Sequence, residues 1–140
     1  MEINIRNKFG WKLYQYSGMQ LWFSGYLTSE TSIQDILIEL VELSYTNDIN
    51  IEKLSKLVNN LSGHFAFVVK ISNSSCFLAV DKICSIPIFD AVKEDKYVVS
   101  NYAPYIKKML NLDDRNLNLQ SFLEIAMSGF SIGNKTIYNG

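Results

Sequence analysis

The chain has 140 residues, of which 48% are hydrophobic and 19% are charged, a composition typical of a folded globular protein rather than a disordered one. Thirteen basic and fourteen acidic side chains give a net charge of -1, which leaves no electrostatic footprint for nucleic acid or for an anionic membrane surface. No apolar run is long enough for a transmembrane helix, and the N-terminus lacks the apolar segment of a signal peptide, so we expect a single cytoplasmic domain over residues 1–140.

Three short apolar segments open the chain and predict strands: Ile3–Ile5, Trp11–Tyr16 and Met19–Leu27. A Ser-Gly pair at residues 17–18 separates the last two segments, so we expect them to form a hairpin. Gly25 interrupts the third segment. A glycine at such a place indicates a bulge, a strand end or a point where another group approaches the backbone closely.

Two helices are predicted next, because the spacing of the apolar residues changes from two to between three and four. The first runs from Ile33 to about Tyr45, with Ser32 as one possible N-cap and an acidic residue in the first turn. The second covers Ile51–Leu61, and Gly63 is available as a left-handed C-cap.

The strongest strand pattern in the chain is Phe65–Ile71, where both faces of the expected strand are apolar except at Lys70. A strand that is apolar on both sides is expected to be covered on both sides. We therefore place it at the centre of a sheet that lies between other layers, with Phe65, Phe67 and Val69 buried.

The second half of the chain alternates strands and helices. Cys76–Val80 should return as the second strand of a hairpin, and Pro87 favours an edge strand or the start of a strand. Tyr97–Ser100 is a further predicted strand, and a short helix should run from Pro104 to Leu110.

A last helix is predicted over Leu119–Met127 and should close at Gly129. The apolar residues on one face of it are Leu119, Phe122, Leu123 and Ala126. Residues 132–140 look like the start of a further element.

The cysteine and histidine residues that could bind zinc are few: Cys76, Cys84 and the single histidine, His64. Isolated thiols in apolar segments are typical of small buried side chains. Three ligands without a usable spacing do not indicate a zinc site, so no metal is predicted. His64 has no nucleophile or acid at a recognisable spacing, which favours a structural role.

Three stretches between residues 61 and 140 form an ordered set of motifs. Residues 61–67 read LSGHFAF, which resembles L-x-G-x-F-A-F, and residues 77–89 read FLAVDKICSIPIF, which resembles F-L-A-R-D-R-x-G-x-x-P-L-Y. Residues 99–140 follow S-E-x-K-A-L, E-Y-L-x-x-G-Y and T-I-F-x-G. Together they resemble the N-terminal glutaminase-type domain of asparagine synthases, a class II glutamine amidotransferase with the N-terminal-nucleophile (Ntn) hydrolase fold.

This resemblance implies an α+β fold in which two stacked antiparallel sheets lie between helical layers (αββα), here with a shortened N-terminal part. In the family the matched motifs belong to the scaffold and not to catalysis. The scaffold positions kept in this chain are Gly63, Phe65, Phe67, Asp81 and Pro87.

The catalytic motifs are where this sequence departs from the family. The family nucleophile is an N-terminal cysteine whose own amine is the base, whereas position 2 here is Glu2. The family's N-G-E, which helps form the oxyanion hole and bind the glutamine amine, falls on Ser24-Gly25-Tyr26. Lys12 is a poor substitute for the family's bidentate arginine. We therefore interpret Glu2, Ser24, Gly25 and Tyr26 as degenerate glutamine-pocket positions and predict no catalytic residue.

The resulting interpretation is a catalytically silent glutaminase-type domain that acts as a scaffold or partner-recognition module of an asparagine-synthase-like, ATP-dependent amide-forming enzyme. The chain contains no phosphate-loop motif, so ATP and Mg²⁺ are expected only in a partner synthetase domain, to which residues 132–140 would start the connection. The expected partner is that domain or a second copy in a homodimer. Two alternatives stay open: an active amidotransferase with a mis-assigned start, and a free-standing interaction or dimerisation protein.

Overall fold

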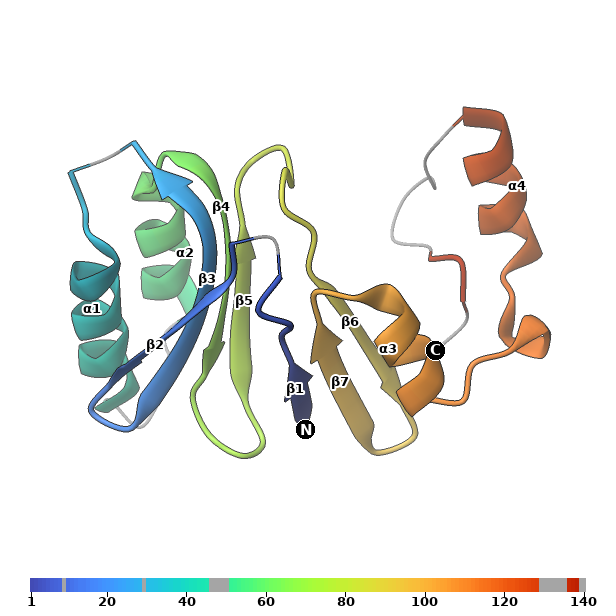
Figure 1. Ribbon diagram of the computed structural model, residues 1–140, viewed down its shortest axis with the longest axis horizontal. Helices are drawn as coiled ribbons and strands as arrows, with labels where there is room; N and C mark the ends of the chain where they lie inside the picture. The colour runs from blue at the N-terminus through green and yellow to red at the C-terminus, as the bar shows by residue number, and fades with distance from the viewer. Residues whose placement is uncertain (9, 29, 46–50, 129–135, 139–140) are drawn as a thin grey trace. The chain divides into compact units, whose positions relative to one another are not determined.

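The computed structural model describes residues 1–8, 10–28, 30–45, 51–128 and 136–138 (Figure 1). These residues form two β-sheets and four α-helices, which confirms the α+β class. The chain divides into two compact units, each of which contains one sheet. The first unit is Met1 with Ile5–Ile88, and the second is Glu2–Asn4 with Phe89–Gly140.

The sheet of the first unit is antiparallel throughout, in the order β2-β3-β4-β5. Its strands are β2 (Lys12–Tyr16), β3 (Met19–Leu27), β4 (Gly63–Lys70) and β5 (Cys76–Val80). Both predicted hairpins are confirmed. The first one turns at Ser17 and Gly18, whose φ angles of 48° and 81° are the left-handed values of a two-residue hairpin turn.

Two helices cover one face of this sheet, α1 (Ile33–Tyr45) and α2 (Ile51–Asn60), and they lie side by side in Figure 1. Both follow the predicted bounds within about one residue. The Ser32 hydroxyl accepts a hydrogen bond from the Asp35 N–H at 3.1 Å, and the Asp35 carboxylate accepts one from the Ser32 N–H at 2.8 Å. This reciprocal cap fixes the start of α1 where the sequence predicts it.

The centre of the first unit is β4. Phe65, Phe67 and Val69 are buried on the face that the helices cover, as predicted. Ala66 and Val68 point to the opposite face and are also fully buried. The two-sided apolar pattern of this strand therefore corresponds to burial on both faces.

Two glycines allow β3 and β4 to approach closely. Gly25 has a φ of 99°, and a Cβ at this position would lie 2.0 Å from the His64 carbonyl oxygen, so a close approach is the one of the three predicted possibilities that the structure shows. The prediction that Gly63 caps a helix is wrong. Gly63 begins β4 opposite Leu27, and a Cβ would lie 2.3 Å from the Tyr26 carbonyl oxygen, so strand pairing is what requires the glycine.

The sheet of the second unit has the order β1-β7-β6, with β1 (Glu2–Asn4), β6 (Phe89–Lys93) and β7 (Lys96–Ser100). β6 begins just after Pro87 and is an edge strand, as the proline predicts. β1 pairs with β7 in parallel, so the expectation that both sheets are antiparallel is wrong. The reason is that no hairpin turn joins these two strands, and their directions are therefore free of the antiparallel constraint.

Helix α3 (Ala103–Met109) covers one face of this second sheet. It begins and ends one residue before the predicted bounds, and the proline in its first turn is confirmed. The core here consists of Val98, Ile106, Leu110 and Leu112.

The last helix, α4 (Leu119–Ser128), matches its predicted range, but its apolar residues are not buried. Leu119 is 70% exposed, Phe122 51%, Leu123 58% and Met127 86%. Gly129, the predicted end of this helix, lies outside the described residues, and of residues 132–140 the structure describes only 136–138. Among the described residues no helix is both long and apolar enough to cross a bilayer.

Candidate functional site

Ser24, Gly25 and Tyr26, the predicted pocket positions on β3, line a cavity of about 400 Å³ in the first unit. We call it the Ser24 cavity. The other described residues around it are Gly10, Lys12, Tyr14, Phe23, Ile33 and Ile86. Three positions that the resemblance implied for a ligand site are therefore brought to one cavity.

The wall at Ser24 is shaped by backbone as much as by side chains. Ser24 is only 2% exposed, although its side chain is polar. A Cβ at Gly10 would lie 3.8 Å from the Ser24 Oγ, so the missing side chain of Gly10 leaves space over the hydroxyl. At Gly25 a Cβ would lie 2.0 Å from the His64 carbonyl oxygen, so a side chain there would clash with the backbone of β4.

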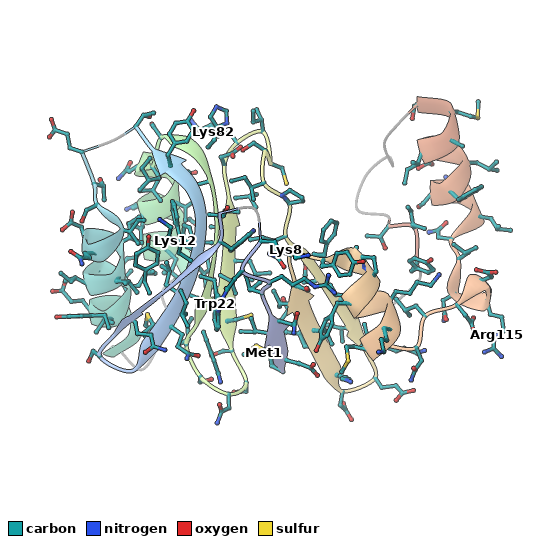
Figure 2. The ribbon with its side chains drawn as sticks, in the orientation of Figure 1. Met1, Lys8, Lys12, Trp22, Lys82 and Arg115 are labelled. Carbon is teal, nitrogen blue, oxygen red and sulfur yellow. The ribbon has the colours of Figure 1, made fainter. Side chains whose placement is uncertain are left out.

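Lys12, which the resemblance makes only a poor substitute for an arginine, also lines this cavity. It begins β2, where Figure 2 labels it, and its register partner on β3 is Phe23, next to Ser24. Among the described residues that line the Ser24 cavity, Lys12 is the only charged one. A signal for this existed, because a two-residue turn at 17–18 sets a register in which residue 12 lies opposite residue 23.

Glu2 is not among the residues that line the cavity, and it belongs to the second unit. Its carboxylate accepts a hydrogen bond from the Tyr105 hydroxyl of α3 and lies 3.9 Å from the Lys96 Nζ. The hydrogen bond to Glu2 raises the pKa of Tyr105, and burial adds to the rise. The position that the resemblance assigns to a nucleophile is thus occupied by an acid, which joins β1 to α3 through its hydrogen bond with Tyr105.

Asp81 serves the turn that follows β5. Its buried carboxylate accepts hydrogen bonds from the N–H groups of Ile83 (2.9 Å), Ser85 (3.2 Å) and Phe65 (3.1 Å), and from the Ser85 hydroxyl. The Ser85 hydroxyl is the main reason that the pKa of Asp81 falls to about 2, with the backbone N–H groups helping against the cost of burial. A general base at neutral pH needs a pKa far closer to 7, so this geometry fits a structural carboxylate.

A second cavity, of about 420 Å³, lies at the start of β4 and is lined in part by His64, Asp81 and Lys82. The four hydrogen bonds to the Asp81 carboxylate come from Phe65, Ile83 and Ser85, so His64 is not paired with this acid. The His64 ring instead lies 5.4 Å from the Tyr26 ring, centroid to centroid. No acid–base pair of the kind that activates a nucleophile is formed by these residues.

The cysteines differ from expectation. Cys76 is half-buried, but Cys84 is exposed, so its interpretation as a buried side chain is wrong. Cys84 lies in the turn after β5 with a φ of 52°, a conformation that glycine adopts more easily, and the related motif has glycine at this place. Within the described ranges, no group of three or more histidine, cysteine or acidic residues could hold a metal ion.

Comparison with models of protein families finds no match to this chain. Comparisons with curated proteins and with solved structures find no match either. The resemblance to glutaminase-type domains therefore rests on the sequence motifs alone, and any function built on it is a proposal.

Proposed function

We propose that this chain is a catalytically silent glutaminase-type domain that acts as a scaffold or partner-recognition module of an asparagine-synthase-like, ATP-dependent amide-forming enzyme. ATP and Mg²⁺ would be bound by the partner synthetase domain and not by this chain. The observation that carries the proposal is the position of Glu2, whose carboxylate is bound by Tyr105 and faces Lys96. Position 2 therefore supplies no thiol nucleophile, and its side chain is already engaged by Tyr105 and Lys96.

The Ser24 cavity supports the same proposal. In the related family an asparagine amide, a glycine and an acid stand in sequence, and here Gly25 alone keeps its identity between Ser24 and Tyr26. The described lining contains no acid that could bind the amine of glutamine. The cavity therefore persists without the groups that would hold and polarise a glutamine side chain.

For the fold we propose the stacked sheet arrangement of the Ntn hydrolases. The first sheet has α1 and α2 on one face, the second has α3, and each has apolar residues on its other face. In the first sheet the residues opposite the helices are Ala66 and Val68, and in the second the residue next to Val98 on the opposite face is Val99. An apolar face needs cover, which favours face-to-face sheets.

A partner-recognition role draws support from α4. Its exposed apolar residues follow the spacing of a helix that buries one face: Leu119, Phe122, Leu123 and Met127. Exposed apolar patches on folded proteins commonly mark interaction surfaces. We assign this face to the synthetase domain.

Sedimentation velocity tests the proposal. The 140-residue chain is mixed with a synthetase domain of the asparagine synthase class from the same genome, and a complex is expected. Leu123→Glu should weaken the complex at least tenfold, because it would bury an unpaired carboxylate. Ile38→Glu is the matched control: Ile38 is a 41% exposed residue on α1, and its replacement should leave the complex unchanged. If the two proteins sediment separately at every concentration, the partner role is lost.

A further inference from the structure

The Ser24 cavity carries a chemistry that the scaffold role does not use. Among the described residues that line it, Lys12 is the one cation and none is acidic. The rest of the lining is largely aromatic or aliphatic: Tyr14, Phe23, Tyr26, Ile33 and Ile86. We propose that this cavity binds a small carboxylic acid with an apolar body, whose carboxylate pairs with the Lys12 ammonium.

Charge is the first step of the argument. A lysine ammonium has three hydrogen-bond donors and no acceptor, so it is satisfied by an anion. Apolar walls lower the local dielectric and strengthen this attraction relative to open water. An amino acid such as glutamine also brings an ammonium of its own, for which the described lining offers no carboxylate, so a simple acid should bind more tightly than a zwitterion.

Size and polarity are the second step. A volume of about 400 Å³ lies in the range of small-molecule sites, which are mostly apolar with a few polar groups that orient the ligand. Lys12 is such a group, and the absence of a side chain at Gly10 leaves room in the lining beside Ser24. The aromatic and aliphatic walls suit a ring or a short chain more than a second polar group.

This inference does not rest on the proposed scaffold role. It follows from the side chains of one cavity in the first unit, whereas partner binding is assigned to α4 in the second. The two can fail separately, because one is read from ligand binding and the other from sedimentation.

The test is a titration of the ¹⁵N-labelled chain with 3-phenylpropanoate, followed by amide shifts. Saturable shifts are expected at Gly10, Lys12 and residues 24–26, and the uncharged analogue 3-phenylpropanamide should bind at least tenfold more weakly. L-glutamine should also bind more weakly than the acid. Equal binding of acid and amide, tighter binding of glutamine, or no saturable shift at these residues would overturn the proposal.

Three variants separate the role of Lys12 from general effects of charge. Lys12→Met should lower the affinity for 3-phenylpropanoate at least tenfold, and Lys12→Arg, which keeps the charge, should retain it within a few-fold. Lys56→Met removes the same charge from an exposed position on α2 and should leave binding unchanged. Undiminished binding by Lys12→Met, or an equal loss in Lys56→Met, would show that Lys12 does not anchor the ligand.

Discussion

β4 and α4 both carry apolar residues at regular spacing, but β4 buries them and α4 exposes them. In β4, five consecutive residues, 65–69, are buried at 2% exposure or less. In α4, the apolar face is the exposed one, and Phe122 is 51% exposed. Both segments have a clear apolar period in the sequence. The period therefore predicts which side chains share an apolar face, but it does not predict whether another part of the same chain buries that face.

The sharpest test of this contrast compares two phenylalanines. Phe67→Ala removes a fully buried ring and should lower the free energy of unfolding by about 3–5 kcal/mol. Phe122→Ala on α4 should lower it by less than about 1 kcal/mol, since half of that side chain is already in water. Urea denaturation followed by circular dichroism measures both. A loss below about 1 kcal/mol for Phe67→Ala would mean that β4 is not the core of its unit.

The sequence predicts the elements that local signals determine better than it predicts contacts between distant parts of the chain. The hairpin of β2 and β3 and the helix α1 are set by local signals, namely a Ser-Gly turn and the cap at Ser32. The parallel pairing of β1 with β7 joins distant parts of the chain, and no local pattern encodes its direction. The exposure of α4 could not be predicted because amphipathic spacing is the same with and without a partner.

For the candidate site, the residues whose positions are set by the register of the β2–β3 hairpin could be predicted from the sequence. The turn at residues 17–18 places Lys12 beside the residues that the family motif places in the pocket. Gly10, Ile33 and Ile86 come from segments outside this hairpin, and their approach depends on tertiary packing. Sequence patterns do not report such contacts.

A second comparison contrasts the attachment of β1 with that of the hairpin strands. β1 has three residues, and the Glu2 carboxylate adds a hydrogen bond from Tyr105. Tyr105→Phe removes that bond and should cost about 1 kcal/mol. Hydrogen exchange should then accelerate at the β1–β7 pairing and stay unchanged in β3 and β4, which have no part in it. Uniform acceleration in both units would show that the bond is not local in its effect.

Acid titration tests an effect that is confined to the turn after β5. The pKa of Asp81 is about 2 in the folded chain, below its ordinary value of 3.8. Its ionised form therefore stabilises the fold above about pH 4, and this contribution is lost as the pH falls from about 4 to 2. Carboxyl ¹³C shifts should show the low pKa directly. In Ser85→Ala the pKa of Asp81 should rise toward its ordinary value, because the strongest hydrogen bond is gone, and an unchanged pKa would contradict this cause.

The smallest expected effect is the gain of activity from a restored nucleophile. In Glu2→Cys with Met1 removed, the new cysteine would carry its own amine base, which would repair a loss confined to the nucleophile. We expect no detectable glutamine hydrolysis, in the starting chain or in this variant. Two further deficits explain why.

One deficit is at Ser24, where the family has an amide that helps form the oxyanion hole. A missing donor of this kind costs roughly 3–4 kcal/mol of transition-state stabilisation. The other is at Lys12, whose single ammonium cannot hold a carboxylate with the two parallel bonds of an arginine, so the glutamine is poorly positioned. A coupled assay for glutamate and ammonia measures the rate. Hydrolysis by the Glu2→Cys protein at a rate typical of enzymes would show an intact pocket, and the difference between this chain and a working amidotransferase would then be one residue in β1.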